Sequence, residues 1–100
     1  MEALGEAFCT NKNLETVDLS FNEITDDGGV ELAKALQVNK TIKKLRLADN
    51  DLGNETGKEF TTSLHDNHRI KELVLEGNSI NISYCRIVNK ICEANKMRII

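Results

Sequence analysis

The chain has 100 residues, of which 40% are hydrophobic and 29% are charged, with a formal net charge of −3 and no proline or tryptophan. This length fits one domain, and the composition is too apolar for a disordered segment. The few aromatic residues and the slightly negative charge exclude a base-stacking platform and bulk attraction to a phosphate backbone, so we expect no nucleic-acid partner.

The cysteines and the apolar runs indicate a cytoplasmic protein. Cys9, Cys85 and Cys92 cannot all pair, and their spacing matches no disulfide framework. The first residues lack the basic patch and apolar run of a signal peptide. No apolar run approaches the roughly 18 residues that a membrane span needs. We therefore expect a reducing, cytoplasmic setting and no membrane contact.

A 28-residue repeat organises the chain. Residues 14–41, 42–69 and 70–97 align without a gap, and they open with LETVDLSFNEI, IKKLRLADNDL and IKELVLEGNSI. Residues 1–13 match the second half of a repeat, and residues 98–100 match the start of a strand that is cut short. A fixed period of about 20 to 50 residues is typical of solenoids. The sequence therefore predicts a single domain over residues 1–100.

Each full repeat is predicted to begin with a short strand, because apolar and polar residues alternate there. The apolar residues form buried columns such as Val17, Leu45 and Leu73. The residues between them would share one exposed face: Thr16, Asp18, Ser20, Lys44, Arg46, Ala48, Glu72, Val74 and Glu76. Three residues that follow the strands would lie at the rim of this face: Phe21, Asp49 and Gly77.

The second half of each repeat is predicted to be a helix, because its apolar residues are spaced three and four apart. The helices are expected over residues 26–38, 54–66 and 82–94. Thr25 or Asp26 is a candidate N-cap for the first helix, and Asn81 or Ser83 for the last. Asp26 and Asp27 also place negative charge at a helix N-terminus, where it is stabilising.

Asparagine recurs at two positions of the repeat. Asn22, Asn50 and Asn78 follow the strands, and their amides are expected to bond the backbone of their own and the neighbouring repeat as a ladder. A second column comes just past the helices: Asn11, Asn39, Asn67 and Asn95. Asparagine tolerates the left-handed backbone conformation of a helix C-cap, which we predict for this second column.

Strands stack about 4.8 Å apart, whereas packed helices need about 8 to 10 Å, so a stack of such repeats must bend. The expected fold class is α/β, a right-handed curved β-α solenoid with a parallel sheet on its concave side. The pattern LxxLxLxxNxI, followed by a helix of the LAKAL type and N-K-T, resembles the leucine-rich repeat, specifically its ribonuclease-inhibitor-like subclass.

This resemblance implies a non-catalytic scaffold that binds another protein through the concave strand face or the repeat edges. It also leaves two alternatives. One is an actin-binding or capping module similar to the repeats of tropomodulins. The other is a regulator of a small GTPase similar to the Ran GTPase activators.

The candidate partner-binding residues lie on the expected strands and their rim: Thr16, Asp18, Ser20, Phe21, Lys44, Arg46, Asp49, Glu72, Val74 and Glu76. In parallel register, Asp18 would neighbour Arg46, and Lys44 would neighbour Glu72. In one interpretation these opposite charges neutralise one another. In the other, the face is a mixed-charge docking surface with Phe21 as its anchor. Phe21 either serves as this anchor or tucks under its own loop.

The last predicted helix has a broader apolar face than the others. Ile87 stands in the column of Glu31 and Glu59, and Ile91 widens the stripe further. A following segment, a terminal cap or another subunit is expected to cover this face; the alternative is a few surface apolar residues without consequence. Because a solenoid leaves unpaired strand edges at its ends, self-association through those ends is also expected.

No motif in the sequence supports catalysis, a cofactor or a metal. Residues 53–59 resemble a phosphate loop but have only three residues between the glycines, and Glu59 replaces the required Ser or Thr. Residues 49–51 lack the downstream glycine and glutamate of a calcium loop, and His65 and His68 have no nearby cysteine pair for zinc. No nucleophile–base set can be assembled, so we expect a protein that is not an enzyme.

Overall fold

The computed structural model describes residues 15–97, in which short strands alternate with helices. The strands are β1 (Thr16–Asp18), β2 (Lys44–Arg46) and β3 (Glu72–Val74). The helices are α2 (Asp26–Val38), α3 (Asn54–Ser63) and α4 (Ile82–Lys96), and a 3₁₀ turn, η1 (Leu64–Asp66), follows α3. The strands begin at residues 16, 44 and 72 and the helices at 26, 54 and 82, so each step is 28 residues. The expected partial repeat 1–13, Asn11 and the short strand 98–100 lie outside the described residues.

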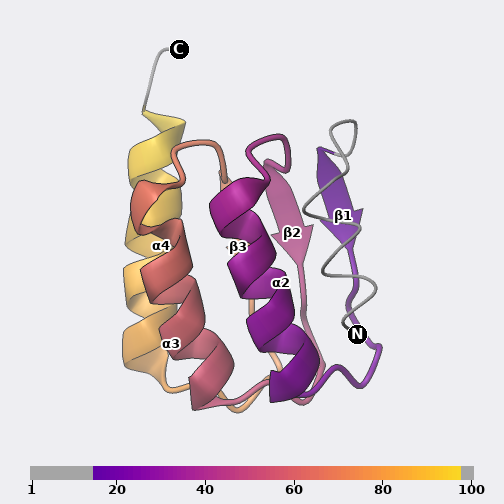
Figure 1. Cartoon of the computed structure of the whole chain (residues 1–100). Helices are drawn as coiled ribbons and strands as arrows, with labels where there is room; N and C mark the ends of the chain where they lie inside the picture. Colours follow the sequence, from indigo (N-terminus) through magenta and orange to yellow (C-terminus); the bar gives the residue numbers. More distant parts are fainter. Residues whose placement is uncertain (1–14, 98–100) are drawn as a thin grey trace.

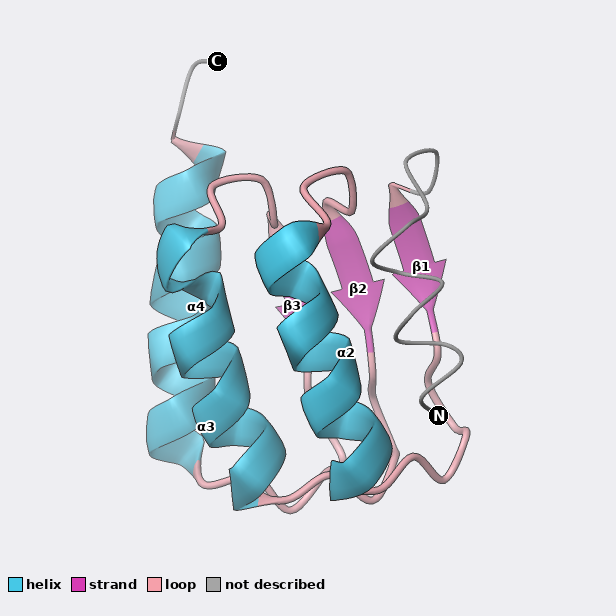
Figure 2. Cartoon of the chain, in the orientation of Figure 1, coloured by secondary structure: helices cyan, strands magenta, loops and turns pink. Residues whose placement is uncertain are grey.

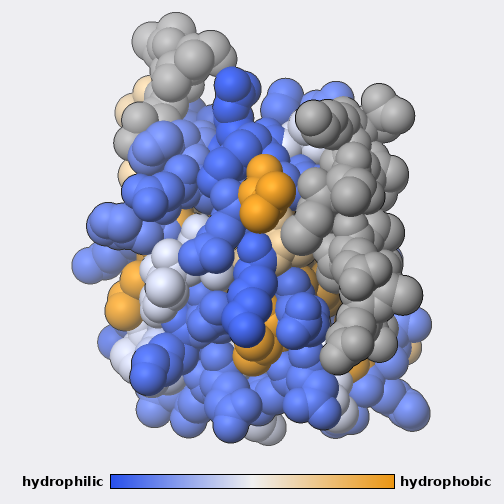
Figure 3. Space-filling view, viewed as in Figure 1, coloured by the Kyte–Doolittle hydropathy of each residue, from blue (hydrophilic) through white to orange (hydrophobic). Residues whose placement is uncertain are grey.

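The strands form one parallel sheet in the order β1-β2-β3, and the helices lie side by side on one face of it (Figures 1 and 2). Val17 pairs with Leu45, and Leu45 pairs with Leu73, so the buried column predicted for the strands is in register. The α/β class and the parallel sheet are confirmed, and the layered arrangement agrees with a curved solenoid. Seen from the helix side, the surface is mostly hydrophilic (Figure 3).

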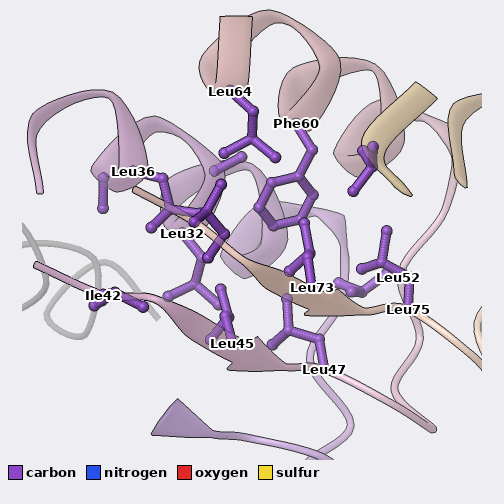
Figure 4. Close-up of a cluster of buried hydrophobic side chains, with 14 of the residues drawn as sticks. Leu32, Leu36, Ile42, Leu45, Leu47, Leu52, Phe60, Leu64, Leu73 and Leu75 are labelled. Atoms are coloured by element: carbon purple, nitrogen blue, oxygen red, sulfur yellow. The ribbon is translucent and has the colours of Figure 1, made fainter. Parts of the chain in front are cut away.

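The core lies between the sheet and the helices, and Figure 4 shows its side chains converging from both layers. Leu45 and Leu47 come from β2 and the residue after it, whereas Leu32 and Phe60 come from α2 and α3; all four are fully buried. Burying such a side chain stabilises a fold by about 1.5 to 3 kcal/mol. The repeated aliphatic columns therefore form the core that joins the sheet to the helices.

A glycine near the start of each of the first two helices lets successive repeats approach closely. A Cβ atom on Gly29 would lie 2.3 Å from Thr56 Oγ1 and 2.6 Å from Leu52 Cδ2. A Cβ on Gly57 would lie 2.6 Å from Ile80 Cγ2. Neither position has room for a larger residue without a shift of its neighbour.

The asparagine ladder after the strands is confirmed for Asn50 and Asn78, whereas the exposed Asn22 side chain donates to Ser20 O of its own loop at 3.1 Å. Asn50 Oδ1 accepts hydrogen bonds from the backbone N–H groups of Asn22 (2.9 Å) and Ile24 (3.0 Å) in the preceding repeat. Its Nδ2 donates to Leu19 O and Leu47 O, each at 3.0 Å. Asn78 repeats this pattern one step further along, towards the loop of the second repeat. Each amide thus joins two loops.

The left-handed conformation predicted for the second asparagine column is wrong. Asn39 has φ −79° and Asn67 has φ −96°, both in the extended region, and Asn95 lies inside α4. The side chains close these turns instead, since Asn67 Oδ1 accepts from the N–H groups of Arg69 (2.8 Å) and Ile70 (3.1 Å). Because the amide bonds the turning backbone directly, no left-handed residue is needed.

Two predicted helix ends differ from the structure. Helix α3 ends at Ser63 and the 3₁₀ turn η1 replaces its last residues, because Asn67 N–H bonds Leu64 O in a tight i to i+3 step of 3.1 Å. Helix α4 continues to Lys96. Its last turn is held in place because Asn95 Nδ2 donates to Asn67 O and Ile70 O, each at 2.9 Å.

The predicted caps are partly confirmed. Asn81 caps α4, since its Oδ1 accepts from Ser83 N–H at 2.9 Å. Thr25 stands at the N-cap position of α2, but its side chain makes no capping bond. The carboxylate of Asp26 turns away from its own helix and bonds the start of α3, where it accepts from Gly53 N–H at 2.8 Å and from the Thr56 hydroxyl at 2.6 Å.

Candidate interaction surface

The face of the sheet opposite the helices carries the side chains predicted for it, some of them exposed and some half-buried. The half-buried ones are Ser20, Ala48, Glu72 and Val74. We call this surface the strand face: Thr16, Asp18, Ser20, Lys44, Arg46, Ala48, Glu72, Val74 and Glu76. Within each strand the central residue points to the core and its two neighbours point outward, which is the alternation expected of a half-buried strand. Pairing brings Lys44 between Thr16 and Glu72, and Arg46 between Asp18 and Val74.

The charges of the strand face pair differently from the expectation. Asp18 lies beside Arg46, and Lys44 beside Glu72, as predicted. The ion pair, however, is diagonal: Arg46 Nε donates to Glu72 Oε2 at 3.2 Å. Arg46 reaches this partner because diagonal neighbours on adjacent strands lie within reach of long side chains. Lys44 takes part in none of the ion pairs formed within residues 15–97.

Asp18 is stabilised locally. Its Oδ1 accepts a hydrogen bond from Ser20 N–H at 3.0 Å. The pKa of Asp18 is lowered mainly by this bond and by the Ser20 hydroxyl, with a smaller contribution from the charge of Arg46. The Ser20 hydroxyl in turn accepts from Ala48 N–H at 3.1 Å. The negative charge of Asp18 therefore stays on the surface without a direct ion pair.

Phe21 lies at the rim with its side chain 76% exposed, so it does not tuck under its loop. It is in the left-handed region at φ 60°, as are the two residues at the same position of the later repeats, Asp49 (φ 55°) and Gly77 (φ 76°). Backbone bonds hold this conformation, since Phe21 N–H donates to Ala48 O at 3.0 Å and Asp49 N–H to Glu76 O at 2.8 Å. A bulky residue rarely adopts this backbone.

A groove of about 420 Å³ opens at the other end of the sheet, where β3 forms the edge. We call it the edge groove. One wall is the chain from Lys71 to Asn78, which includes β3, and the other is formed by α4 and the loop before it. The residues of this second wall are Ile80, Ile82, Cys85, Asn89, Cys92, Glu93 and Lys96. The predicted apolar residue Ile87 is 46% exposed but does not line the groove.

A family model described as "Leucine Rich repeat" matches residues 10–33 and 38–60. The first match includes β1 and the start of α2, and the second includes β2 and most of α3. Both therefore cover the strand–loop–helix unit that the sequence and the structure repeat. The chain is a leucine-rich-repeat protein. Its assignment to the ribonuclease-inhibitor-like subclass stays a prediction.

Solved structures of other leucine-rich-repeat domains resemble this one. A structure described as the actin-binding site 2 of leiomodin-1 has a TM-score of 0.74 and 16% identity, over 95% of this chain and 71% of that one. The C-terminal domain of tropomodulin from Caenorhabditis elegans has a TM-score of 0.56 and 15% identity, over 95% of this chain and 74% of that one. At these identities the likeness concerns the fold. No curated protein matches the chain.

Metal and thiol chemistry has little support in the described part of this leucine-rich-repeat protein. Residues 15–97 hold no group of three or more His, Cys, Asp or Glu side chains that could bind a metal ion. Cys85 is partly exposed, and burial raises the pKa of its thiol. Cys92 is buried, which raises the pKa of its thiol to about 11. Both thiols are therefore protonated and weakly nucleophilic at neutral pH. None of the helices described is long and apolar enough to cross a membrane.

Sequence reasoning missed the role of Asp26 and the edge groove. Asp26 and Asn54 occupy the same repeat position, and each accepts a backbone N–H of the next repeat, Asn54 from Asn81 at 2.7 Å. The sequence shows two acceptor side chains at this repeat position. Their place at a helix N-terminus is equally typical of residues that stabilise their own helix. The groove depends on which side chains meet at the edge, and a pattern along the chain does not show this.

Proposed function

We propose that this leucine-rich-repeat protein binds another protein through the strand face, with Phe21 as the anchor at its rim. The proposal rests mainly on the exposure of Phe21, an aromatic residue that is 76% exposed on a left-handed backbone. The later repeats adopt the same backbone at Asp49 and Gly77, so what distinguishes Phe21 is a large aromatic side chain at this position of the loop. Exposed aromatic residues are also the type enriched among binding hot spots.

The charges of the strand face support the same proposal. Arg46 and Glu72 neutralise each other at 3.2 Å, whereas Lys44 and Glu76 belong to none of the ion pairs within residues 15–97. The face therefore offers both signs of charge to a partner, beside an apolar anchor. Mixed charges of this kind set partner choice and orientation more than affinity.

The test compares affinity capture by two double variants with capture by the wild-type chain. Phe21→Asn with Arg46→Ala removes the anchor and a cation from the strand face. Val38→Asn with Lys58→Ala replaces one exposed apolar residue by asparagine and one cation by alanine on α2 and α3 instead. We expect proteins that bind the wild type to be retained by the helix variant and lost from the strand-face variant. Equal capture by both variants would place the interface elsewhere.

Actin is the second candidate partner, because the leiomodin structure that this fold resembles is described as an actin-binding site. The test is co-sedimentation of the chain with actin filaments, together with the rate of filament growth at pointed ends. Binding that the strand-face variant abolishes and the helix variant keeps would identify actin as the partner. A chain that neither sediments with filaments nor slows their growth would exclude actin and leave the general proposal standing.

A further inference from the structure

We infer that the edge groove is a second binding site, which takes an extended peptide segment as a fourth parallel strand. The segment would carry apolar residues at two alternate positions, with a basic residue on each side of them. This goes beyond the proposed function, because it concerns the edge of β3 and not the strand face. The inference is carried by the backbone of the edge, by the apolar wall of the groove and by the charges at its rim.

The backbone of β3 is equipped to pair on its outer side. Residues on either side of β2 bond the third repeat. Lys43 O accepts from Glu72 N–H at 3.1 Å, Leu47 N–H donates to Val74 O at 2.9 Å, and Asp49 N–H donates to Glu76 O at 2.8 Å. The equivalent groups one repeat later belong to Lys71, Leu75 and Gly77. They point away from β2, because alternate residues of a parallel strand bond opposite neighbours. No strand pairs with this edge within residues 15–97.

The apolar wall of the groove is incompletely covered. Leu45 and Leu47 are fully buried by the next repeat, whereas their equivalents Leu73 and Leu75 retain 5% and 7% exposure. Ile80 and Cys85 beside them are only partly buried. Two apolar side chains of an added strand would point to this wall, in the same way that Leu73 and Leu75 point into the core between the sheet and the helices.

The third repeat differs from the first two at the positions that hold a following helix. Gly29 and Gly57 let the next unit approach within contact of the helix backbone, but the same position of α4 is Cys85. Asp26 and Asn54 accept an N–H of the next unit, but the same position is Ile82, an apolar side chain that is 63% exposed. These two differences remove contacts that a following helix would need. A single added strand needs neither contact.

Five charged residues line the groove: Lys71, Glu72, Glu76, Glu93 and Lys96. Lys96 pairs with Glu93, and Lys71 Nζ donates to Asn95 O, so the two glutamates on the β3 side favour a basic segment. Glu72 and Glu76 stand on either side of Val74 on the outward side of this edge. Glu72 is engaged by Arg46, whereas Glu76 is exposed and takes part in none of the ion pairs within residues 15–97. Lysine or arginine opposite these two positions would reproduce the Lys44–Glu72 neighbour pair that the sheet already contains.

The test measures binding of a fluorescent peptide with the core Lys-Leu-Val-Leu-Lys to the full chain by anisotropy. Its control has the core Glu-Leu-Val-Leu-Glu. Glu76→Lys should weaken the first peptide by about five- to tenfold and favour the second, because a cross-strand attraction becomes a repulsion. Glu55→Lys makes the same charge reversal at an exposed position of α3, away from the groove and the strand face, and should leave the affinity of both peptides unchanged. Bound peptide should also slow alkylation of Cys85, which lines the groove.

Two results would overturn this inference. One is equal affinity of the wild-type chain for the two peptides, or an affinity that Glu76→Lys does not change. The other is a concentration-dependent dimer, detected by sedimentation, that blocks Cys85 alkylation in the absence of peptide. A second copy of the chain would then be the occupant of the groove, as the expected self-association through solenoid ends requires.

Discussion

Asp26 in the first turn of α2 lies 2.6 Å from the hydroxyl of Thr56 in the first turn of α3. The same carboxylate oxygen accepts the N–H groups of Gly53 and Thr56 at 2.8 and 3.2 Å. One repeat therefore provides the N-cap of the next. Because Asn54 also accepts a backbone N–H of the next repeat, from Asn81, these links form a second ladder at the start of the helices.

Asp26→Ala is expected to lower the free energy of unfolding by about 1 to 2 kcal/mol at neutral pH, because α3 loses its cap. Burial opposes ionisation of Asp26, but the bonds from Thr56 and Gly53 outweigh it and lower its pKa below 3.8. The ionised form therefore stabilises the fold above about pH 4, and this contribution is lost as the pH falls through the lowered pKa. Urea unfolding of the wild type and the variant at several pH values measures this difference.

The stability difference between the wild type and Asp26→Ala should thus shrink on acidification. Asp27→Ala removes an exposed acidic residue of the same helix turn and serves as the control. A loss of stability that is equal for the two variants, or that persists unchanged at low pH, would contradict the capping role of Asp26.

Asn50→Ala is expected to destabilise the fold by about 2 to 4 kcal/mol, because buried backbone groups of two repeats lose their partners. The affected donors include Asn22 N–H and Ile24 N–H, which now bond the amide oxygen. Asn22→Ala is the control at the same repeat position, where the exposed side chain donates to Ser20 O. Chemical denaturation should show a loss below about 1 kcal/mol for this control. Similar losses for both variants would mean that the ladder contributes little.

Phe21→Gly is expected to stabilise the fold by about 0.5 to 1 kcal/mol while it weakens partner binding. Glycine adopts the left-handed backbone without strain, although it also gains freedom in the unfolded chain. Val38, which is 63% exposed at the last position of α2, provides the control. Val38→Gly should lower stability, since glycine is unfavourable in a helix. Thermal unfolding distinguishes the two signs, and a destabilised Phe21→Gly would show that the aromatic side chain is structural.

Ser63→Ala is expected to raise the free energy of unfolding by about 1 kcal/mol. The Ser63 hydroxyl is buried and has no hydrogen-bond partner in the described structure, and such a group carries an uncompensated desolvation cost. Ala35 stands at the same position of the first repeat and is also buried. Thr62→Ala, at an exposed neighbour, changes helix propensity by about 0.5 kcal/mol or less and removes one exposed hydrogen bond, from the Thr62 hydroxyl to Lys58 O at 3.3 Å. An equal gain from both variants would assign the effect to propensity.

The repeat period made much of the fold predictable. The starts of α2, α3 and α4 and the register of the strands follow from residues that recur every 28 positions, because each copy meets the same packing problem. The strand face could be predicted for the same reason, since alternation in a strand decides which side chains point outward. The ends of α3 and α4 were less predictable, because side chains from other segments, such as Asn95 and Asn67, hold those turns.

The repeating unit, its length and its inward and outward sides can be predicted from the local spacing of apolar residues. Three features become visible only when the repeats are stacked: Arg46 pairs with Glu72, Asp26 caps the helix of the next repeat, and Phe21 is exposed on a left-handed backbone. These features depend on how far each side chain reaches across to a neighbouring repeat. The stacking of the repeats sets that distance, so the sequence pattern of a single repeat does not predict it.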